Sequence, residues 1–432
     1  MKLINTTGRG GKAARQQLDT LIGRRSATYE RALPAAKRIV EAVRRGGDRA
    51  LRRYAAKFDA ITPQTQLRIS EAEMQAAWDA TSDELKSALK TAAKNIRSFA
   101  RRQRPKEWDY SPAAGVKTGQ RIRPVGAVGC YVPGGRYPLP STLLMTVVPA
   151  QVAGVERIVV VSPKPAQETL AAASLLGVKE MYRLGGAQAV AALAYGTESI
   201  PRVDKIVGPG NAFVTAAKKL VAFDCAIDML AGPTEIVVVS ENGDASGIAS
   251  DLVAQAEHDP DALAIFITTK AALAQAVIAE VKQRVRTHPV AREAIARNGL
   301  TIVAATATEA QSISNALAPE HLTVDSTAGL DWIQNAGSVF VGRHSAQPLG
   351  DYVSGPNHTL PTCGLARVRG GLSVMDFLKL ITVQEYTSEG LRNLGPAGIT
   401  MAEAEGLLGH AEAIRVRGVK AGARSLKARK NA

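Results

Sequence analysis

The sequence predicts an α/β fold with two Rossmann-like parallel-sheet domains and helical N-terminal and C-terminal extensions. From Arg123 onward, short β-branched runs alternate with alanine-rich stretches of helical periodicity, a pattern typical of βαβ units. The alternation occurs twice in succession, and helical patterns precede and follow it. With 432 residues, the chain has the length of about three average domains, or two with insertions.

Composition indicates a globular protein, because hydrophobic residues make up 46% and charged residues 22% of the chain. No apolar run reaches 18 residues; the nearest, Leu143 to Val155, is interrupted by polar residues, which argues against a membrane span. The first residues lack the apolar core of a secretory signal. Cys130, Cys225 and Cys363 are scattered without a CxxC motif, so we expect cysteines that pack in a reducing cytoplasm.

Basic charge is concentrated near the two ends of the chain. The net charge is +15, yet residues 1–107 hold 24 Lys and Arg against 11 Asp and Glu, and residues 415–432 hold seven basic and no acidic residues. A duplex-binding protein carries such charge on the element that reads the groove. We therefore interpret the excess as a solvated surface and a frayed terminus, and expect no nucleic-acid or membrane partner.

The amino-terminal region is helical in pattern from Ala27 to about Arg104, with apolar residues three or four apart, as at Ile39 and Val43. Gly46-Gly47 followed by Asp48 predicts a break and a new helix cap. Strands are then predicted in two runs. The first comprises 125–133, 157–163, 181–186 and 205–210, with helices near 166–176, 187–195 and 211–223. The second comprises 234–240, 262–268, 300–306, 321–325 and 338–342, with helices near 246–257, 270–285, 307–317 and 327–335.

These runs predict four parts of the chain. We assign 1–24 to an N-terminal arm, 25–124 together with 235–373 to a first α/β domain, 125–234 to a second Rossmann-like domain, and 374–432 to a C-terminal helical tail. Stacked α/β halves usually bind ligands between them, at the carboxyl ends of the strands. The tail, helical from about 374 to 417, is too small for a large core and must pack on another element or subunit.

Three glycine-rich strand ends favour a nucleotide. No GxGxxG opens a helix after a strand and no GxxxxGK[ST] motif occurs. Instead, strands turn into helices at Tyr131–Gly135, Gly185–Gln188 and Gly208–Asn211. Backbone N–H groups at such turns bind phosphate, although glycine also simply permits a tight turn. Three such turns within 80 residues favour the nucleotide.

Four of the six histidines have neighbours suited to chemistry, although each alone is more commonly a satisfied structural side chain. Gln255 and His258 are three residues apart at a helix end and share a face. Together with Asp351 and His410 they offer mixed nitrogen and oxygen ligands, which suit zinc or a similar divalent ion.

The other pairs offer acid–base groups. Glu320 and His321 are adjacent at the start of a strand, where they present a carboxylate and an imidazole. His358 follows Asp351 in a loop rich in Gly, Ser and Pro, and loops of this kind carry function. His410 lies five residues after Glu405 in the final helix.

From about Arg25 to Val416 the chain resembles the histidinol dehydrogenase family. The resemblance rests on ordered blocks that include VGCYVPGG, PAQVAGV, LGGAQAVAALAYGT, VGPGNAFV, IDMLAGPTE, DLVAQAEHDPDA, APEHL, GDYVSGPNHTLPT, GGLSVMDFLK and EGLLGHAEAIRVR. It implies a zinc-dependent homodimer that uses NAD and oxidises L-histidinol to L-histidine in two steps through an enclosed aldehyde, L-histidinaldehyde.

The resemblance also implies residue roles. It assigns Gln255, His258, Asp351 and His410 as ligands of one zinc ion per subunit, with His410 supplied by the partner's tail. Glu320 and His321 resemble the catalytic pair, and Tyr131, Gln188 and Asn211 resemble the NAD contacts. The substrate contacts that it implies are Thr234, His358 and Glu405, besides the zinc ligands and the catalytic pair.

These residue types fit the chemistry. The hydroxyl proton of an alcohol must leave as hydride does, which requires a base of near-neutral pKa such as His321. The second oxidation uses an aldehyde hydrate and so requires a carboxylate that activates water, for which Glu320 is suited. Zinc bound to the substrate's nitrogens would act mainly as a template.

The sequence departs from the family pattern in two places. Thr234 stands where serine is common, and GGRYPLPST places Arg136 and Tyr137 beside the first glycine-rich turn. These departures keep open a related zinc- and NAD-dependent polyol dehydrogenase, such as a sulfopropanediol dehydrogenase. A third reading, a metal-dependent binding protein without turnover, conflicts with the presence of both Glu320 and His321.

Overall fold

The chain divides into two compact units in the computed structural model, which describes residues 1–8, 11–23, 27–62, 64–134, 137–327 and 330–418. The larger unit comprises 1–104 and 125–377, and the smaller comprises 105–124 and 378–432. The larger unit contains two six-stranded sheets, and the smaller contains a three-stranded sheet. Each unit is described below by itself.

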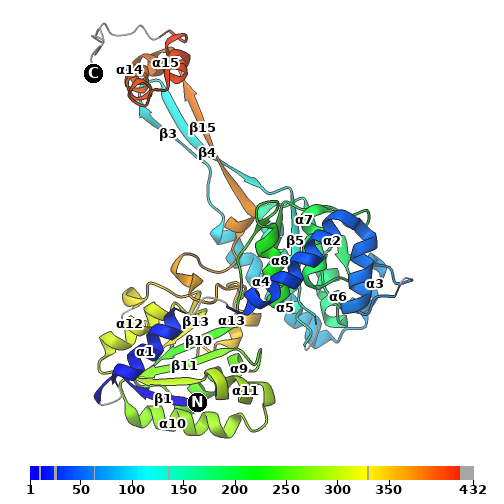
Figure 1. Ribbon diagram of the computed structural model, residues 1–432, viewed down its shortest axis with the longest axis vertical. Coiled ribbons are helices and arrows are strands. Elements are labelled where there is room, and N and C mark those ends of the chain that lie inside the picture. Colours follow the sequence, from blue (N-terminus) through cyan, green and yellow to red (C-terminus); the bar gives the residue numbers. More distant parts are fainter. Residues whose placement is uncertain (9–10, 24–26, 63, 135–136, 328–329, 419–432) are drawn as a thin grey trace. The chain divides into compact units, whose positions relative to one another are not determined.

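One six-stranded sheet is parallel throughout and forms the first layer of the larger unit. Its strands, in spatial order, are β1 (Lys2–Asn5), β12 (Leu300–Val303), β11 (Leu263–Thr268), β10 (Glu235–Val239), β13 (His321–Val324) and β14 (Ser338–Val341). Helices cover both faces (Figure 1). They are α1 (Gly11–Ile22) and α12 (Ala307–Leu317) on one face, and α9 (Ala245–Ala256), α10 (Ala271–Arg284) and α11 (Pro289–Asn298) on the other.

Alternation of side chains along the strands explains the two faces. Ile236 and Val238 of β10 pack with α9 and α11, whereas Val237 between them packs with α1 and α12. Strands buried on both faces read as continuous apolar runs, as EIVVV and LAIFIT do here. This sheet therefore matches the second predicted run of strands, with α11 as a further helix that the sequence analysis did not separate.

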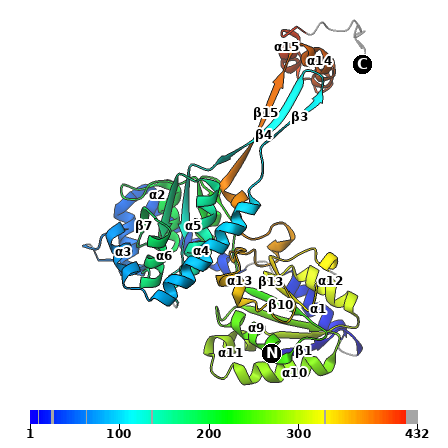
Figure 2. The same cartoon turned by 180° about the vertical axis from the view of Figure 1, so that it is seen from behind.

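The second six-stranded sheet is mainly parallel, with one short antiparallel edge strand. In spatial order it contains β2 (Arg68–Ile69), β7 (Glu180–Tyr182), β6 (Arg157–Val161), β5 (Ala127–Tyr131), β8 (Lys205–Val207) and β9 (Ala226–Ile227). Residues of α2 (Ala27–Phe58), α7 (Gly186–Tyr195) and α8 (Ala212–Val221) share one core with it. The remaining helices, which lie together in Figure 2, are α3 (Glu71–Asp79), α4 (Asp83–Gln103), α5 (Pro140–Ala153) and α6 (Gln167–Leu175).

The predicted break at Gly46-Gly47 is present inside α2. Gly47 has φ +49° and ψ −138°, which is not helical. A Cβ at this position would lie 2.5 Å from the Glu198 carboxylate, which accepts a hydrogen bond from the Asp48 N–H. The second half of α2 is thus capped by Glu198 from elsewhere in the chain, while Asp48 itself bonds Ser199.

The observed grouping differs from the predicted domain boundaries. The expected arm at 1–24 supplies β1, which pairs with β12, and α1, which packs on the same sheet. Residues 27–104, predicted to join 235–373, instead place β2 beside β7 and α2 against α7 and α8. Periodicity reveals that a segment is amphipathic but not which of two similar apolar sheets it will cover, so sequence pattern alone could not decide this.

The smaller unit contains an antiparallel sheet and two helices. Its strands, in the order β15-β4-β3, are β15 (Leu378–Tyr386), β4 (Val116–Pro124) and β3 (Trp108–Ala113), and its helices are α14 (Ser388–Ala404) and α15 (Leu408–Arg415). The prediction of continuous helix from 374 was wrong over β15, where β-branched and apolar residues pair with β4. Its core is small and includes Ile399, Ala402 and Ala411.

Short elements complete the larger unit. They are α13 (Pro348–Tyr352) and the 3₁₀ turns η2 (Leu330–Trp332), η3 (Leu365–Arg367) and η4 (Val374–Phe377). The helix expected near 327–335 is represented by η2, with residues 328 and 329 outside the described part. Among the described helices, none has the length and apolar character needed to cross a bilayer.

Candidate active site

Polar side chains gather at the amino ends of β10 and β13. These neighbouring strands are parallel, with Ile236 opposite His321. Thr234 immediately precedes β10 and Glu320 immediately precedes β13, so the register places both beside His321, the first residue of β13. We call Thr234, Gln255, Glu320, His321 and Asp351 the polar cluster.

Gln255 reaches this edge because α9 runs back from the carboxyl end of β10, which returns its last turn to the amino edge of the sheet. The side chain is buried, and its Nε2 donates to the Thr234 hydroxyl and lies 3.3 Å from His321 Nδ1. Gln255 Oε1 is also buried and has no hydrogen-bond partner among the described residues. A buried amide oxygen left without a donor is an acceptor available to a ligand or cation.

Glu320 is held by one of its two carboxylate oxygens. Its Oε2 accepts the Thr234 hydroxyl at 2.5 Å and the Glu235 N–H at 2.8 Å. Threonine supplies the same hydroxyl as serine at this position, so its extra methyl group leaves the contact with Glu320 intact. The cluster therefore has a carboxylate with fixed orientation.

His321 lies between two carboxylates and is almost fully buried. Its Nδ1 is 3.6 Å from Glu320 Oε2, and its Nε2 is 3.5 Å from Asp351 Oδ1. Burial alone lowers the pKa of His321, but Glu320 and Asp351 outweigh burial and raise the pKa to about 10. In this arrangement His321 holds a proton at neutral pH, which differs from the near-neutral base expected from sequence.

Asp351 connects His321 to His358. Burial raises the pKa of Asp351, but the contact with His321 outweighs it and holds the pKa below its ordinary value. The Asp351 carbonyl accepts the His358 Nδ1–H at 2.8 Å, and His358 Nε2 lies 3.3 Å from the Thr142 hydroxyl. Burial lowers the pKa of His358. The ring is therefore neutral, with Nδ1 as donor and Nε2 as acceptor.

The expected zinc ligands divide into three locations. Gln255 and Asp351 belong to the polar cluster, and His258 lies exposed in the turn after α9. His410 lies in α15 of the smaller unit, which also contains Glu405 at the end of α14. Within the described ranges, no three His, Cys, Asp or Glu side chains are arranged to hold a metal. The bare Gln255 oxygen and the Asp351 carboxylate nonetheless fit a divalent cation by donor chemistry.

The three predicted cofactor residues lie on the other sheet, at the carboxyl ends of its strands. Tyr131 ends β5, Gln188 lies in the first turns of α7 after β7, and Asn211 caps α8 after β8. The Tyr131 hydroxyl accepts the Gly186 N–H at 3.0 Å. A Cβ on Gly208 would lie 2.1 Å from the Tyr131 carbonyl oxygen. The three glycine-rich turns are therefore contiguous.

Asp59, at the end of α2, is a residue of this region that sequence reasoning missed. It is buried, and its Oδ2 accepts the Gln188 amide at 3.0 Å and the Gly185 N–H at 3.2 Å. Burial raises its pKa. Asp59 is 126 residues from Gly185 and lies in no motif, so only the packing of α2 on α7 reveals it.

Two of the helix starts expected to face phosphate already use some of their N–H groups. Asp59 and Tyr131 accept those of Gly185 and Gly186, and the Asn211 side chain accepts those of Phe213 and Val214. At the first turn, Gly135 and Arg136 lie outside the described residues, and Tyr137 is exposed. Any dinucleotide contact here must therefore also involve side chains such as Asn211, which is exposed.

The cysteines lie apart from these groups. Cys130 and Cys225 are buried, and burial raises the pKa of each thiol to about 12, which suits packing rather than nucleophilic chemistry. The Cys363 N–H donates to Glu235 Oε1.

Two doubly wound sheets with a buried acid–base cluster define the class of α/β enzymes. The histidinol dehydrogenase family model matches residues 22–418. Histidinol dehydrogenase of Methanothermobacter thermautotrophicus is 47% identical over 392 residues, 88% of this chain and 92% of that protein. That of Gluconobacter oxydans is 44% identical over 96% of this chain and 99% of its own. The chain therefore belongs to the histidinol dehydrogenase family.

A solved structure agrees with this assignment. The crystal structure of histidinol dehydrogenase from Elizabethkingia anophelis is 36% identical to this chain and superposes with a TM-score of 0.90. The match covers 96% of this chain and 98% of the other. The similarity therefore spans both units of the chain.

Proposed function

We propose that the chain catalyses the NAD-linked, four-electron oxidation of L-histidinol to L-histidine through L-histidinaldehyde, as a cytoplasmic enzyme of histidine biosynthesis. Family membership supports the substrate. The observation that carries the proposal is the buried Glu320–His321 pair beside the bare Gln255 Oε1, because it combines proton transfer with a binding contact.

Glu320 and His321 divide the proton transfers in this proposal. With Asp351 engaged as a zinc ligand, one of the two carboxylates that hold the proton on His321 would be neutralised, and the imidazole could take up the hydroxyl proton as the carbinol carbon loses hydride. In the second oxidation, Glu320 activates the water that hydrates the aldehyde. Thr234 and the Glu235 N–H keep the carboxylate oriented in both steps. His358, held by Asp351 and Thr142, is a neutral imidazole that can contact the substrate.

Two groups absent from the chain complete the chemistry. Gln255, His258, Asp351 and a partner's His410 would hold one zinc ion per subunit, which when bound supplies a template for the amino and imidazole nitrogens of histidinol. Tyr131, Gln188 and Asn211 would contact NAD, which when bound accepts the hydride. Besides these ligands and the catalytic pair, Thr234, His358 and Glu405 are proposed substrate contacts.

A homodimer is supported by the surface of the smaller unit. β15 exposes apolar side chains on both of its faces, including Leu380, Ile381 and Val383. Exposed apolar residues gathered on one strand indicate a protein interface. We propose that this unit packs on a second copy, whose site receives Glu405 and His410. No nucleic-acid or membrane partner is proposed.

One assay separates this function from its relatives. NADH formation is followed with L-histidinol, with dihydroxypropanesulfonate and without an alcohol. We expect NADH only with histidinol, at two per histidine formed. Turnover of the sulfonate alone would assign the chain to a related polyol dehydrogenase. No turnover of either alcohol would favour the third alternative, a metal-dependent binding protein without turnover.

A further inference from the structure

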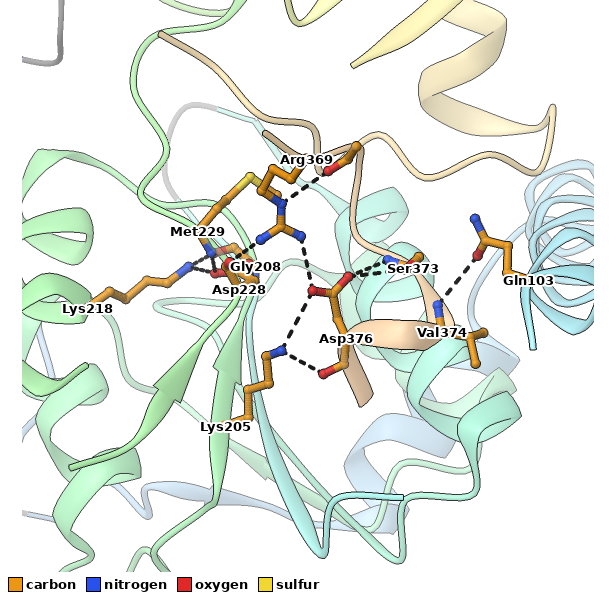
Figure 3. A network of polar contacts seen from close by, with 11 residues as sticks. Gln103, Lys205, Gly208, Lys218, Asp228, Met229, Arg369, Ser373, Val374 and Asp376 are labelled. Atoms are coloured by element: carbon orange, nitrogen blue, oxygen red, sulfur yellow. Dashed lines mark hydrogen bonds and ion pairs between the residues drawn. The ribbon is translucent and has the colours of Figure 1, made fainter. Parts of the chain in front are cut away.

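A buried ion pair underlies the third glycine-rich turn of the larger unit (Figure 3). We propose that Lys218 and Asp228 are positioning residues that hold this turn for the dinucleotide and fix it relative to the acid–base pair. The proposal rests on the proposed NAD site, which it deepens by adding residues that act on the cofactor through the backbone.

The depth of the pair argues against a role in stability alone. The Lys218 and Asp228 side chains are 3% and 0% exposed, and they contact each other directly. Transfer of two charges out of water costs much of what their attraction returns, so a buried pair is a poor stabiliser compared with apolar packing. What the pair does determine is backbone geometry, because both charged side chains form hydrogen bonds with the backbone of a single residue.

That position is Gly208, which both members of the pair bind. Lys218 Nζ donates to the Gly208 carbonyl at 3.0 Å, and the Gly208 N–H donates to Asp228 Oδ2 at 2.7 Å. Gly208 has φ +110°, and a Cβ there would collide with the Tyr131 carbonyl. The two peptide groups around Gly208 are thus oriented by charge-assisted hydrogen bonds, against the backbone of one predicted cofactor residue.

The pair also bears on Asn211, another predicted cofactor residue. Asn211 follows Gly208 by three residues and lies seven residues before Lys218, which is about two helical turns along α8. Lys218 is thus connected to Asn211, at the end of the turn, through α8. It is connected to Gly208, at the start of the turn, through its ammonium group. Both ends of the segment 208–211 are therefore connected to Lys218.

The same network continues toward the catalytic pair. Asp228 begins the segment 228–234, and its Oδ1 accepts the Met229 N–H at 2.5 Å. Arg369 donates to the Asp228 carbonyl and to Asp376 Oδ1, the latter at 3.0 Å, as Figure 3 shows. Lys205 also donates to the Asp376 carbonyl.

Two further bonds hold the end of this segment. Thr215 of α8 donates to the Ala231 carbonyl at 2.9 Å, and the Gly232 N–H donates to the Thr362 hydroxyl at 2.6 Å. The segment ends at Thr234, which donates to Glu320. One continuous set of contacts therefore sets the position of the Gly208 turn relative to Glu320.

The test replaces the pair without leaving one buried charge alone. In the double variant Lys218→Met/Asp228→Asn, we expect the KM for NAD and the Kd for NADH, from its fluorescence, to rise about tenfold, since small misplacements of positioning groups have effects of this size. The KM for histidinol should change less than about threefold. The matched control is Arg157→Met/Glu180→Gln, which removes an ion pair between β6 and β7.

Each result decides the matter. A folded double variant with unchanged Kd for NADH overturns the proposal, as does an equal rise in the control. If the double variant does not fold, Arg369→Lys tests the same network at a partly exposed side chain, and an unchanged Kd there overturns it. Wild-type protein that binds no NADH would instead refute the proposed cofactor, and this inference with it.

Discussion

The two parallel sheets of the larger unit carry their polar side chains at opposite edges. In the sheet built around β5, the predicted cofactor residues Tyr131, Gln188 and Asn211 follow the strands, at their carboxyl ends. In the sheet built around β10, Thr234 and Glu320 precede the strands, at their amino ends. The sequence analysis expected the ligand cleft at the carboxyl ends of the strands but placed Glu320 and His321 at the start of a strand, and the structure has them there.

The difference between the edges is electrostatic. Helices that follow strands present their N-termini at the carboxyl edge, where partial positive charge favours phosphate. The same helices run back toward the start of the next strand and present their C-termini at the amino edge, where partial negative charge favours cations. The end of α9 brings Gln255 and His258 to the amino edge, where the Glu320 and Asp351 carboxylates add negative charge. One sheet thus suits an anionic dinucleotide and the other a metal.

The largest expected effect separates chemistry from cofactor binding. His321→Asn removes a proton-transfer group of the polar cluster and should lower kcat by about 10² to 10⁴, while the Kd for NADH stays unchanged. Glu320→Gln should slow histidine formation from the aldehyde more than alcohol oxidation. Stopped-flow NADH formation from each substrate measures both, with His344→Asn as an exposed control. Undiminished aldehyde oxidation in Glu320→Gln would contradict the division of labour.

Metal removal tests the cation-binding character of the amino edge. Chelation should abolish activity and added zinc should restore it, because the proposed template for histidinol is lost with the metal while its ligands remain in the chain. His258→Ala should lose the metal and most turnover while it retains the fold and NADH binding. Zinc content by atomic emission and circular dichroism give the result, with His344→Ala as the matched exposed histidine. A fully active, metal-free His258→Ala protein would remove His258 from the ligand set.

A third experiment asks whether the amino edge is completed by the smaller unit of another copy. An inactive His258→Ala chain is co-expressed with an inactive His410→Ala chain, and the mixed dimer is purified by two tags. With sites shared in trans, one site carries both lesions and the other neither, so up to about half of the activity should return. Verified mixed dimers without activity would show that each site uses its own chain's His410.

Much of the fold could be predicted from the sequence because strands buried on both faces consist of continuous apolar residues. The strands β10 to β14 were all predicted from runs of apolar and β-branched residues, although β14 itself is only partly buried. Which sheet α2 covers, and the pairing of β15 with β4, depend on contacts between segments far apart in the chain. These long-range choices leave no local pattern.

The site shows the same division. Glu320 and His321 are adjacent in sequence, and Gln255 and His258 share a helix end, so both pairs are visible without a structure. Asp59 and the Lys218–Asp228 pair carry no such signal, since their partners are backbone groups brought near by packing. The raised pKa of His321 likewise depends on the approach of Asp351 from another element.

Thr234 offers a smaller effect within the polar cluster. Its hydroxyl donates to the charged Glu320, and a hydrogen bond of this type is worth about 1.5–3 kcal/mol. Thr234→Val should therefore lower kcat/KM about ten- to a hundredfold, whereas Thr234→Ser keeps the hydroxyl and should remain within about twofold. Steady-state kinetics at saturating NAD make the comparison. Equal activity of the valine variant would show that the Glu235 N–H alone orients Glu320.

The smallest effect concerns Asp251, which supports the amino edge from the middle of α9. Burial raises its pKa to about 6, and the hydrogen bond from the Gln347 backbone only partly opposes this. Gln347 in turn donates to Asp351 of the polar cluster. Because the pKa is higher in the folded chain than its ordinary 3.8, the contribution of Asp251 to stability is fully present below about pH 4 and is lost as pH rises through 6.

Asp251→Asn keeps an acceptor for Gln347 but removes the titration. The variant should therefore melt about 1–2 °C above wild type at pH 8, with the difference shrinking toward pH 4, a small shift because one partly solvated group acts on a large cooperative unit. Differential scanning calorimetry at several pH values measures it, with the exposed Asp19→Asn as control. The kcat should be unchanged throughout, since Asp251 lies outside the polar cluster. A difference in melting temperature that is constant with pH would mean that Asp251 acts through packing and not through its charge.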